Sequence, residues 1–138
     1  MPDSLVFLDT NILVYAYSAN EPDKALIAKK LLATGSAVVS AQVLNELVSV
    51  MHRKLNLPVD VIDSALREIL THVETVSLTP ETTLAALRLM KTHKFSWYDS
   101  LIIAAAQIAG CSLLFTEDLH HGFQIMTGPL IVNPFQDT

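Results

Sequence analysis

The sequence predicts an α/β fold in three layers, with a central parallel sheet of four to five strands flanked by helices. Short apolar runs of strand length alternate with longer segments whose apolar residues recur every three or four positions. Strands that alternate with helices are joined by right-handed crossovers, so helices cover both faces of the sheet. We therefore expect the loops after the strands to meet at one edge, where such sheets bind their ligands.

The length and composition indicate a single domain over residues 1–138. A chain of 138 residues has the usual size of one domain, and we find no internal repeat or linker in it. The hydrophobic fraction of 51% is high for a globular protein, which indicates a large core, apolar surface kept for a partner, or both.

The first predicted strand covers residues 5–8, a short apolar run. Asp9 follows it directly and begins a capped turn into a helix. A second helix begins near Pro22, and Gly35 ends it. Residues 37–39 then form the second predicted strand, so the chain begins with two strands joined by helices.

Ser40 is positioned to cap a helix that reaches about Lys54. Its apolar positions have helical spacing: Val43, Leu44, Leu47, Val48 and Met51. Pro58 begins a further helix that continues to residue 70, and residues 73–76 form a short strand. Glu46 lies on the first of these helices, beside its apolar stripe.

Pro80 has the position of a first helical residue and begins the next helix. We expect this helix to continue through Leu84, Leu87 and Met90. Residues 97–109 are apolar nearly all round, which predicts a helix buried on most sides and ended by Gly110. The last two predicted strands cover residues 112–115 and 130–132.

Several classes of protein are disfavoured by simple features of the chain. The longest apolar run, residues 101–106, is far shorter than the roughly 18–20 residues needed to cross a bilayer. The first residues lack the pattern of a secretory signal, so we expect a cytoplasmic protein. The single cysteine, Cys111, is expected to be buried rather than catalytic. The net charge of -5 does not exclude nucleic acid, because acidic residues committed to a cation leave a nearly balanced surface.

Four acidic residues stand at junctions with predicted buried elements: Asp9, Glu46, Asp99 and Asp118. Carboxylates gathered in a cleft of low dielectric repel one another unless a cation holds them together. Mg²⁺ and Mn²⁺ prefer oxygen ligands, whereas one cysteine and scattered histidines offer no zinc site. Each acid also has an ordinary interpretation. Asp9 could be a helix cap and Glu46 an exposed charge on a helix. Asp99 could respond to the helix dipole, and Asp118 could be a turn residue.

The fragments FLDTN, LNELVSV, SWYDSLIIAAA and LLFTEDL follow one another along the whole chain, and together they resemble the PIN-domain family, especially its VapC-like toxin branch. This resemblance implies a Mg²⁺ or Mn²⁺ site and hydrolysis of phosphodiester bonds in RNA. It implies that Asp9, Glu46, Asp99 and Asp118 are the catalytic, metal-binding acids, with Asn11 and Thr116 in support. Asn11 is expected to orient Asp9 or a bound water, and Thr116 to donate to Asp118 or Asp9.

The toxin branch also implies partners. Its members are the toxins of type II toxin–antitoxin pairs, form homodimers, and are held inactive by a small cognate antitoxin. The residues favoured for contact with the RNA substrate are basic and flank the expected cleft: Arg53, Lys54, Lys91 and Lys94. Glu117 is expected to turn outward, His120 and His121 to be solvated, and Trp97 and Tyr98 to pack at a helix start rather than stack on bases.

Other functions remain to be weighed against a toxin ribonuclease. A phosphatase with an aspartyl-phosphate intermediate would want a second acid two residues after Asp9, where this chain has Asn11. No GxGxxG follows any predicted strand, which disfavours a dinucleotide-binding enzyme. A housekeeping RNA-processing nuclease, or a binding module that keeps the fold and acts through protein partners, stays open.

Overall fold

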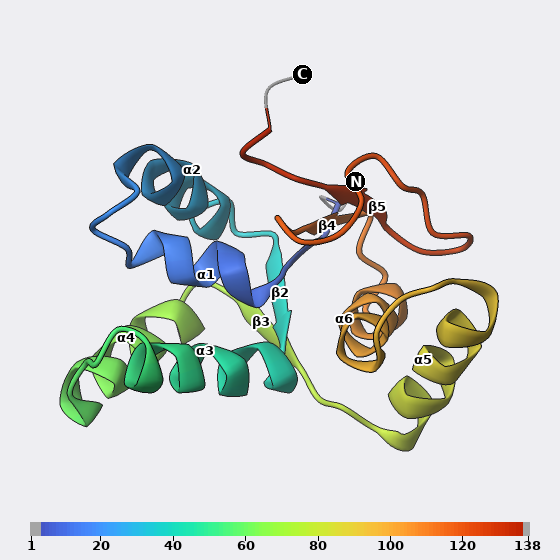
Figure 1. The fold of residues 1–138 in the computed structure, drawn as a ribbon, viewed down its shortest axis with the longest axis horizontal. Coiled ribbons are helices and arrows are strands. Elements are labelled where there is room, and N and C mark those ends of the chain that lie inside the picture. Colours follow the sequence, from blue (N-terminus) through green and yellow to red (C-terminus); the bar gives the residue numbers. More distant parts are fainter. Residues whose placement is uncertain (1–3, 137–138) are drawn as a thin grey trace.

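The computed structural model describes residues 4–136, and its helices and strands alternate as expected (Figure 1). No helix within these residues has the length and apolar character needed to cross a membrane. The elements follow in the order β1 (Val6–Leu8), α1 (Thr10–Ala16), α2 (Pro22–Leu32), β2 (Ala37–Ser40), α3 (Ala41–Arg53), α4 (Val59–Leu70), β3 (Glu74–Val76), α5 (Pro80–Thr92), α6 (Trp97–Ile108), β4 (Leu113–Phe115) and β5 (Leu130–Val132).

The sheet is parallel throughout, and its five strands lie in the order β3-β2-β1-β4-β5. β1 occupies the centre, where Val6 pairs with Ala37 of β2 on one side and with Leu113 of β4 on the other. The expected parallel sheet is confirmed, with five strands. Since parallel strands share one carboxyl edge, the residues that follow β1 and β4 are brought side by side.

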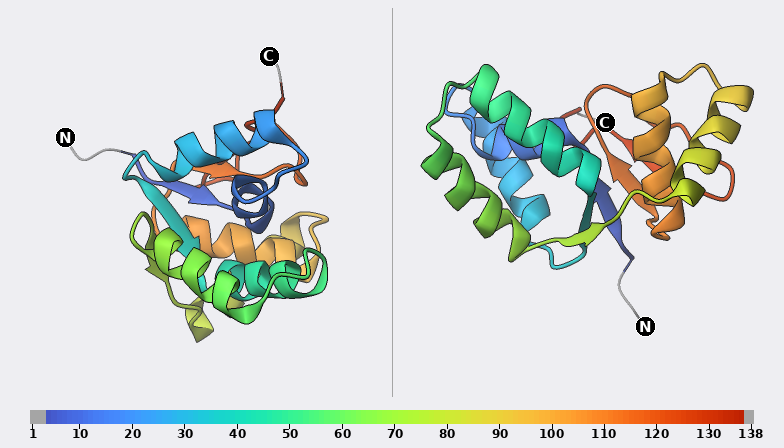
Figure 2. Two further views of the ribbon diagram at one scale, coloured as in Figure 1. Left: turned by 90° about the vertical axis from the view of Figure 1, so that its left-hand side faces the viewer. Right: turned by 90° about the horizontal axis from the view of Figure 1, so that it is seen from below.

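Helices lie on both faces of the sheet and complete the three layers (Figures 1 and 2). α1 and α2 lie on one face, whereas α3, α4, α5 and α6 lie on the other. Across β2, β1, β4 and β5, paired positions form one row of fully buried side chains: Val38, Phe7, Leu114 and Ile131. Burial of this continuous apolar row is the main force that fixes the register of the strands.

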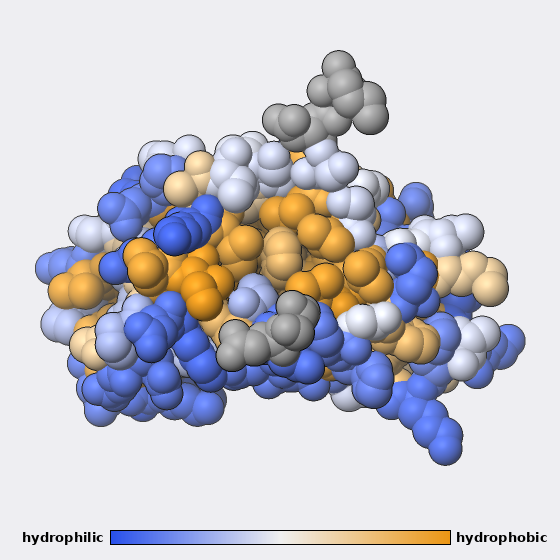
Figure 3. Space-filling view, turned by 90° about the horizontal axis from the view of Figure 1, so that it is seen from above, coloured by the Kyte–Doolittle hydropathy of each residue, from blue (hydrophilic) through white to orange (hydrophobic). Residues whose placement is uncertain are grey.

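The face that carries α1 and α2 is less completely covered beyond β1. Leu113 and Phe115 of β4 and Leu130 and Val132 of β5 are only half-buried. The space-filling view from above shows apolar side chains gathered in the middle of the molecule (Figure 3). The expectation of exposed apolar surface is therefore confirmed.

Helix α5 buries small side chains and leaves most of its larger apolar side chains exposed. Leu84, Leu87 and Met90 are 56%, 50% and 41% exposed, whereas Ala85 and Ala86 are 3% and 0% exposed. Small side chains allow the backbone of α5 to approach α6 closely, and this close packing takes precedence over burial of the larger side chains. The expected helix is confirmed, and its buried face is formed mainly by small side chains.

Candidate active site

The four predicted acids line a single cavity of about 560 Å³. Asp9 follows β1 and Asp118 lies just beyond β4, so the neighbouring carboxyl ends of these strands bring them together. Glu46 comes from the second turn of α3 and Asp99 from the first turn of α6. The cavity therefore lies where a parallel sheet binds its ligands, as the sequence predicted.

Asp9 is the most buried of the four acids, with 7% of its surface exposed. One carboxylate oxygen accepts a hydrogen bond from the backbone N–H of Thr10 at 2.7 Å, and the other accepts one from the Thr116 hydroxyl at 2.8 Å. Burial raises the pKa of Asp9 to about 6; these two hydrogen bonds oppose the rise, while the charges of Glu46 and Asp118 add to it.

Glu46 is held by two side chains that the sequence did not single out. The Thr10 hydroxyl donates to one carboxylate oxygen at 2.7 Å, and the Gln42 amide lies 3.4 Å from the other. The same amide lies 3.3 Å from the carbonyl oxygen of Tyr98, so it links α3 to the first turn of α6. Two features of the sequence could have indicated these contacts. Thr10 directly follows Asp9, and Gln42 lies one helical turn before Glu46.

Asn11 has a different partner from the one expected. Its amide donates to a carboxylate oxygen of Asp118 at 2.9 Å, and its carbonyl oxygen accepts from the backbone N–H of Glu117 at 3.2 Å. Asn11 lies in the first turn of α1 beside the loop after β4, so its side chain reaches that loop rather than Asp9. Thr116 does donate to Asp9, and its hydroxyl also accepts from the backbone N–H of Asp118.

Glu117 does not line the cavity and pairs with residues of the first two helices instead. Its carboxylate accepts hydrogen bonds from Tyr15 of α1 and Lys24 of α2. Partial burial raises the pKa of Glu117, but these hydrogen bonds outweigh burial, and the net shift is downward. The Glu117 carboxylate is thus paired with the Lys24 ammonium group.

Asp99 is half-buried in the first turn of α6, where Ser96 is the N-terminal cap. The Ser96 hydroxyl accepts from the backbone N–H of Asp99 at 3.1 Å. The cap fixes the backbone of this turn, and the helix dipole favours a negative charge there. Both effects favour a carboxylate at this edge of the cavity.

The donor set of the cavity suits a hard divalent cation, because its four acidic side chains all supply carboxylate oxygens. Within residues 4–136, however, no three acidic, histidine or cysteine side chains lie close enough to share one ion. Asp9, Glu46 and Asp118 are each tied to their own hydrogen-bond donors, and like charges repel across the cavity. Shared coordination of one cation therefore requires these carboxylates to move toward one another.

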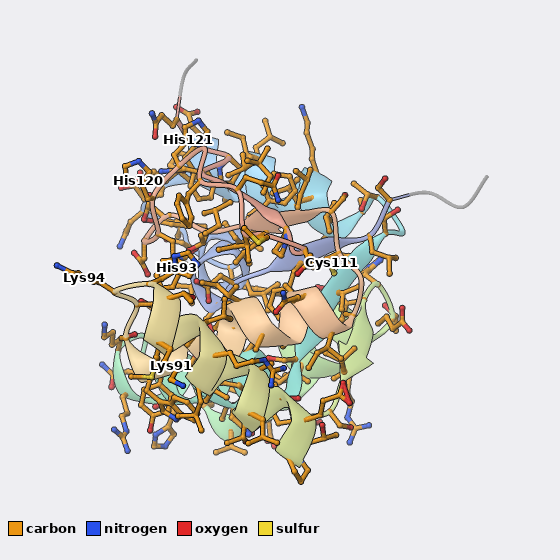
Figure 4. The ribbon with its side chains drawn as sticks, turned by 90° about the vertical axis from the view of Figure 1, so that its right-hand side faces the viewer. Lys91, His93, Lys94, Cys111, His120 and His121 are labelled. Atoms are coloured by element: carbon orange, nitrogen blue, oxygen red, sulfur yellow. The ribbon has the colours of Figure 1, made fainter. Side chains whose placement is uncertain are left out.

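The basic residues favoured for RNA contact are dispersed. Lys54 lines the cavity, whereas Arg53, Lys91 and Lys94 are exposed and do not line it. In Figure 4, Lys94 and His120 lie toward the edge of the molecule where α6 begins. The Nδ1 atom of His121 accepts from the backbone N–H of Asn133 at 2.9 Å, which identifies a structural contact for this side chain.

The surroundings of Tyr98 differ from those expected from the sequence. Tyr98 lines the cavity and is 65% exposed, so its ring faces solvent rather than packing into the core, contrary to expectation.

Cys111 is buried as expected, at the opposite end of the molecule from His120 (Figure 4). Burial raises the pKa of its thiol to about 12, and the charge of Glu74 adds to the rise. Such a thiol is a poor nucleophile at neutral pH.

Comparison with known sequences identifies one family. The model of the PIN domain matches residues 6–124. This match includes all of the elements from β1 to β4, and with them the four acids that line the cavity. Comparison with curated proteins finds no significant match.

Several solved structures share the fold. A toxin–antitoxin complex from Klebsiella pneumoniae aligns over 97% of this chain and 100% of its own, with 22% identity and a TM-score of 0.68. Mycobacterium tuberculosis VapC20, a sarcin-ricin loop cleaving toxin, aligns over 82% and 91%, with 21% identity and a TM-score of 0.66. VapBC2 from Rickettsia felis, bound to a DNA fragment from its promoter, aligns over 83% and 88%, with 23% identity and a TM-score of 0.62.

Proposed function

Because the chain belongs to the PIN domain family, we propose that it is a divalent-metal-dependent endoribonuclease that hydrolyses phosphodiester bonds in RNA. The observation that carries this proposal is the meeting of Asp9, Glu46, Asp99 and Asp118 in one cavity at the carboxyl ends of the strands. An oxygen-only set of this kind favours Mg²⁺ or Mn²⁺.

In this proposal the four acids bind the cation, and their neighbours hold them in place. When bound, the cation supplies Lewis acidity toward the phosphate and lowers the pKa of a water molecule. Thr116 and Thr10 orient Asp9 and Glu46, while Asn11 orients Asp118. Lys54, which lines the cavity, supplies a positive charge for the RNA backbone. Arg53, Lys91 and Lys94 extend this contact along the RNA.

We further propose that the protein is the toxin of a type II toxin–antitoxin pair and acts in the cytoplasm as a homodimer. Support comes from the similar structures, two of which are a toxin–antitoxin complex and VapBC2, while the third is a toxin that cleaves the sarcin-ricin loop. Exposed apolar residues on α5 and the half-buried strands β4 and β5 offer surface for partners. The alternatives are a housekeeping RNA-processing nuclease and a binding module of the same fold.

The test is cleavage of RNA by the purified chain with Mg²⁺ or Mn²⁺ and with a chelator. We expect cleavage to require the metal and to fall at least about a hundredfold in Asp9→Asn and Asp99→Asn, since metal positioning contributes several kcal/mol at the transition state. Asp63→Asn, which changes an exposed acid on α4, is the matched control and should cleave normally. The products should carry a 5′-phosphate and a 3′-hydroxyl. Full activity in chelator would reject the metal-dependent reaction.

A further inference from the structure

We propose that Tyr15, Lys24 and Glu117, here called the Lys24 cluster, position Asp118 at the cavity and keep the Glu117 carboxylate away from the cation. The inference rests on the proposed function of the four acids and deepens it. Glu117 lies directly between Thr116 and Asp118 in the chain, so whatever holds its side chain also orients the turn from which Asp118 projects.

Each oxygen of the Glu117 carboxylate has its own donor in the cluster. The Tyr15 hydroxyl donates to Oε1 at 2.6 Å, and the Lys24 ammonium donates to Oε2 at 2.5 Å. The ammonium also donates to the Tyr15 oxygen at 3.3 Å, which closes the triangle. Both oxygens are therefore engaged, and a cation in the cavity would have to displace an ammonium group to reach Glu117.

The surroundings of Lys24 make this ion pair more rigid than an ordinary surface pair. Its ammonium lies 4.7 Å from the centre of the Tyr15 ring and 5.4 Å from that of Phe135, and the two rings meet edge to face at 5.0 Å. The Lys24 and Glu117 side chains are 31% and 27% exposed, against 77% and 58% for Arg67 and Asp63. Water therefore screens the Lys24 pair less.

Helix α1 connects the cluster to Asp118. Asn11 and Tyr15 are one helical turn apart and project from the same face of α1. Asn11 binds the backbone N–H of Glu117 and the carboxylate of Asp118, while Tyr15 binds the carboxylate of Glu117. α1 thus holds three groups of the turn, two of them on Glu117 and one on Asp118. If the contact between Tyr15 and the Glu117 carboxylate is lost, Asn11 and Thr116 still bind the turn.

The test is titration of metal-free protein with Mn²⁺ by calorimetry, in the absence of RNA. The variants are Tyr15→Phe, which removes only the hydroxyl, Lys24→Met, Glu117→Gln and the Lys24→Met/Glu117→Gln double variant. We expect the Lys24→Met and Glu117→Gln single variants to bind Mn²⁺ about tenfold more weakly, the range found when groups that orient metal ligands are removed. We expect Tyr15→Phe to lose less affinity. The two single losses should not add in the double variant, which should bind Mn²⁺ no more weakly than the single variant that binds it less tightly. Asp63→Asn, which breaks the exposed ion pair on α4, should bind normally.

Two results would overturn the inference. If Lys24→Met tightens Mn²⁺ binding while Glu117→Gln weakens it, Glu117 already binds the cation in the unchanged protein, and the cluster does not act by positioning Asp118. If every cluster variant binds Mn²⁺ as the unchanged protein does, the cluster only stabilises the fold. Cleavage assayed in parallel should show a lower kcat with little change in KM. Because Mn²⁺ binding is measured without RNA, absence of cleavage with the expected binding pattern would reject the ribonuclease function alone.

Discussion

The carboxylate of Asp9 lies where burial and two neighbouring acids oppose its negative charge. Its pKa in the folded chain is about 6, above the value of 3.8 for an unperturbed aspartate. Between these two values the folded state holds a proton that the unfolded state has released. Without metal, the contribution of Asp9 to stability is therefore most favourable below the lower pKa and is lost as the pH rises through about 6.

We expect the metal-free protein to gain on the order of 1 kcal/mol in free energy of unfolding from Asp9 when the pH falls from 7.5 to 5. Asp9→Asn should be more stable than the unchanged protein at pH 7.5 and should lack this part of the pH dependence. The measurement is urea unfolding in chelator at both pH values, with Asp63→Asn as the control for loss of an exposed acid. If the free energy of unfolding depends on pH equally in Asp9→Asn and in the unchanged protein, the charge of Asp9 does not destabilise the fold.

At the scale of single residues, the sequence led to the four acids of the cavity but not to all of the contacts that orient them. Asn11 was expected to orient Asp9 or a bound water, and its amide donates to Asp118 rather than to Asp9. Gln42 was not predicted at all, although it lies beside Glu46. Hydrogen-bond partners depend on the directions of side chains across elements that are distant in sequence, and spacing along one chain does not determine those directions.

The first turn of α6 shows how one element controls a candidate ligand. Ser96 caps the helix through the backbone N–H of Asp99. We expect Ser96→Ala to lower the free energy of unfolding by about 1 kcal/mol, the usual effect of losing such a cap. Because the frayed turn carries Asp99, Mn²⁺ affinity should fall several-fold as well.

The measurements are urea unfolding and Mn²⁺ titration of the same protein samples. Ser96→Thr keeps a hydroxyl at the cap and should restore both stability and affinity. Thr83→Ala removes an exposed hydroxyl from α5 and should change neither. A variant Ser96→Ala that loses stability but binds Mn²⁺ normally would separate the cap from the cavity.

Among the elements, periodicity predicted which segments are helices better than which of their faces are buried. α5 begins at Pro80 as expected, yet Ala85 and Ala86 rather than Leu84 and Leu87 face α6. Apolar residues occur on both sides of this helix, so hydrophobicity alone left its orientation undetermined. The closeness of two helices depends on side-chain size at the contact, and that contact is known only once the helices are packed.

For the whole molecule, the alternation of strands and helices was sufficient to predict a parallel sheet. It did not predict the order β3-β2-β1-β4-β5, because several arrangements satisfy right-handed crossovers. The placement of β1 between β2 and β4 is what unites the four acids. The sequence therefore predicted which residues follow strands, and the topology determined which of those residues meet.

The exposed apolar surfaces bear on how the intact protein is controlled. A second cavity of about 590 Å³ lies beside α1, α2 and α4 and is lined by apolar Leu32 and Ile69 and by polar Glu68 and His72. We expect a small partner peptide to cover such surface and to insert an Arg or Lys among the four acids, where its charge replaces that of the metal. Free protein should then arrest growth, and the partner should relieve the arrest.

The measurement is growth and co-purification when the chain is expressed alone and with the small open reading frame beside its gene. Asp99→Asn is the matched control, because it should be harmless alone and still co-purify with the partner. Harmless expression of a demonstrably active nuclease, with no co-purifying peptide, would reject the toxin role and favour housekeeping RNA processing.

The central position of β1 also determines when the cavity forms during translation. Asp9 is made early, but the Thr116 hydroxyl that binds it is 107 residues further along the chain. β1 likewise lacks one of its two neighbours until Leu113–Phe115 has been synthesised. A nascent chain on the ribosome therefore cannot bring its four acids together before β4 and Asp118 emerge.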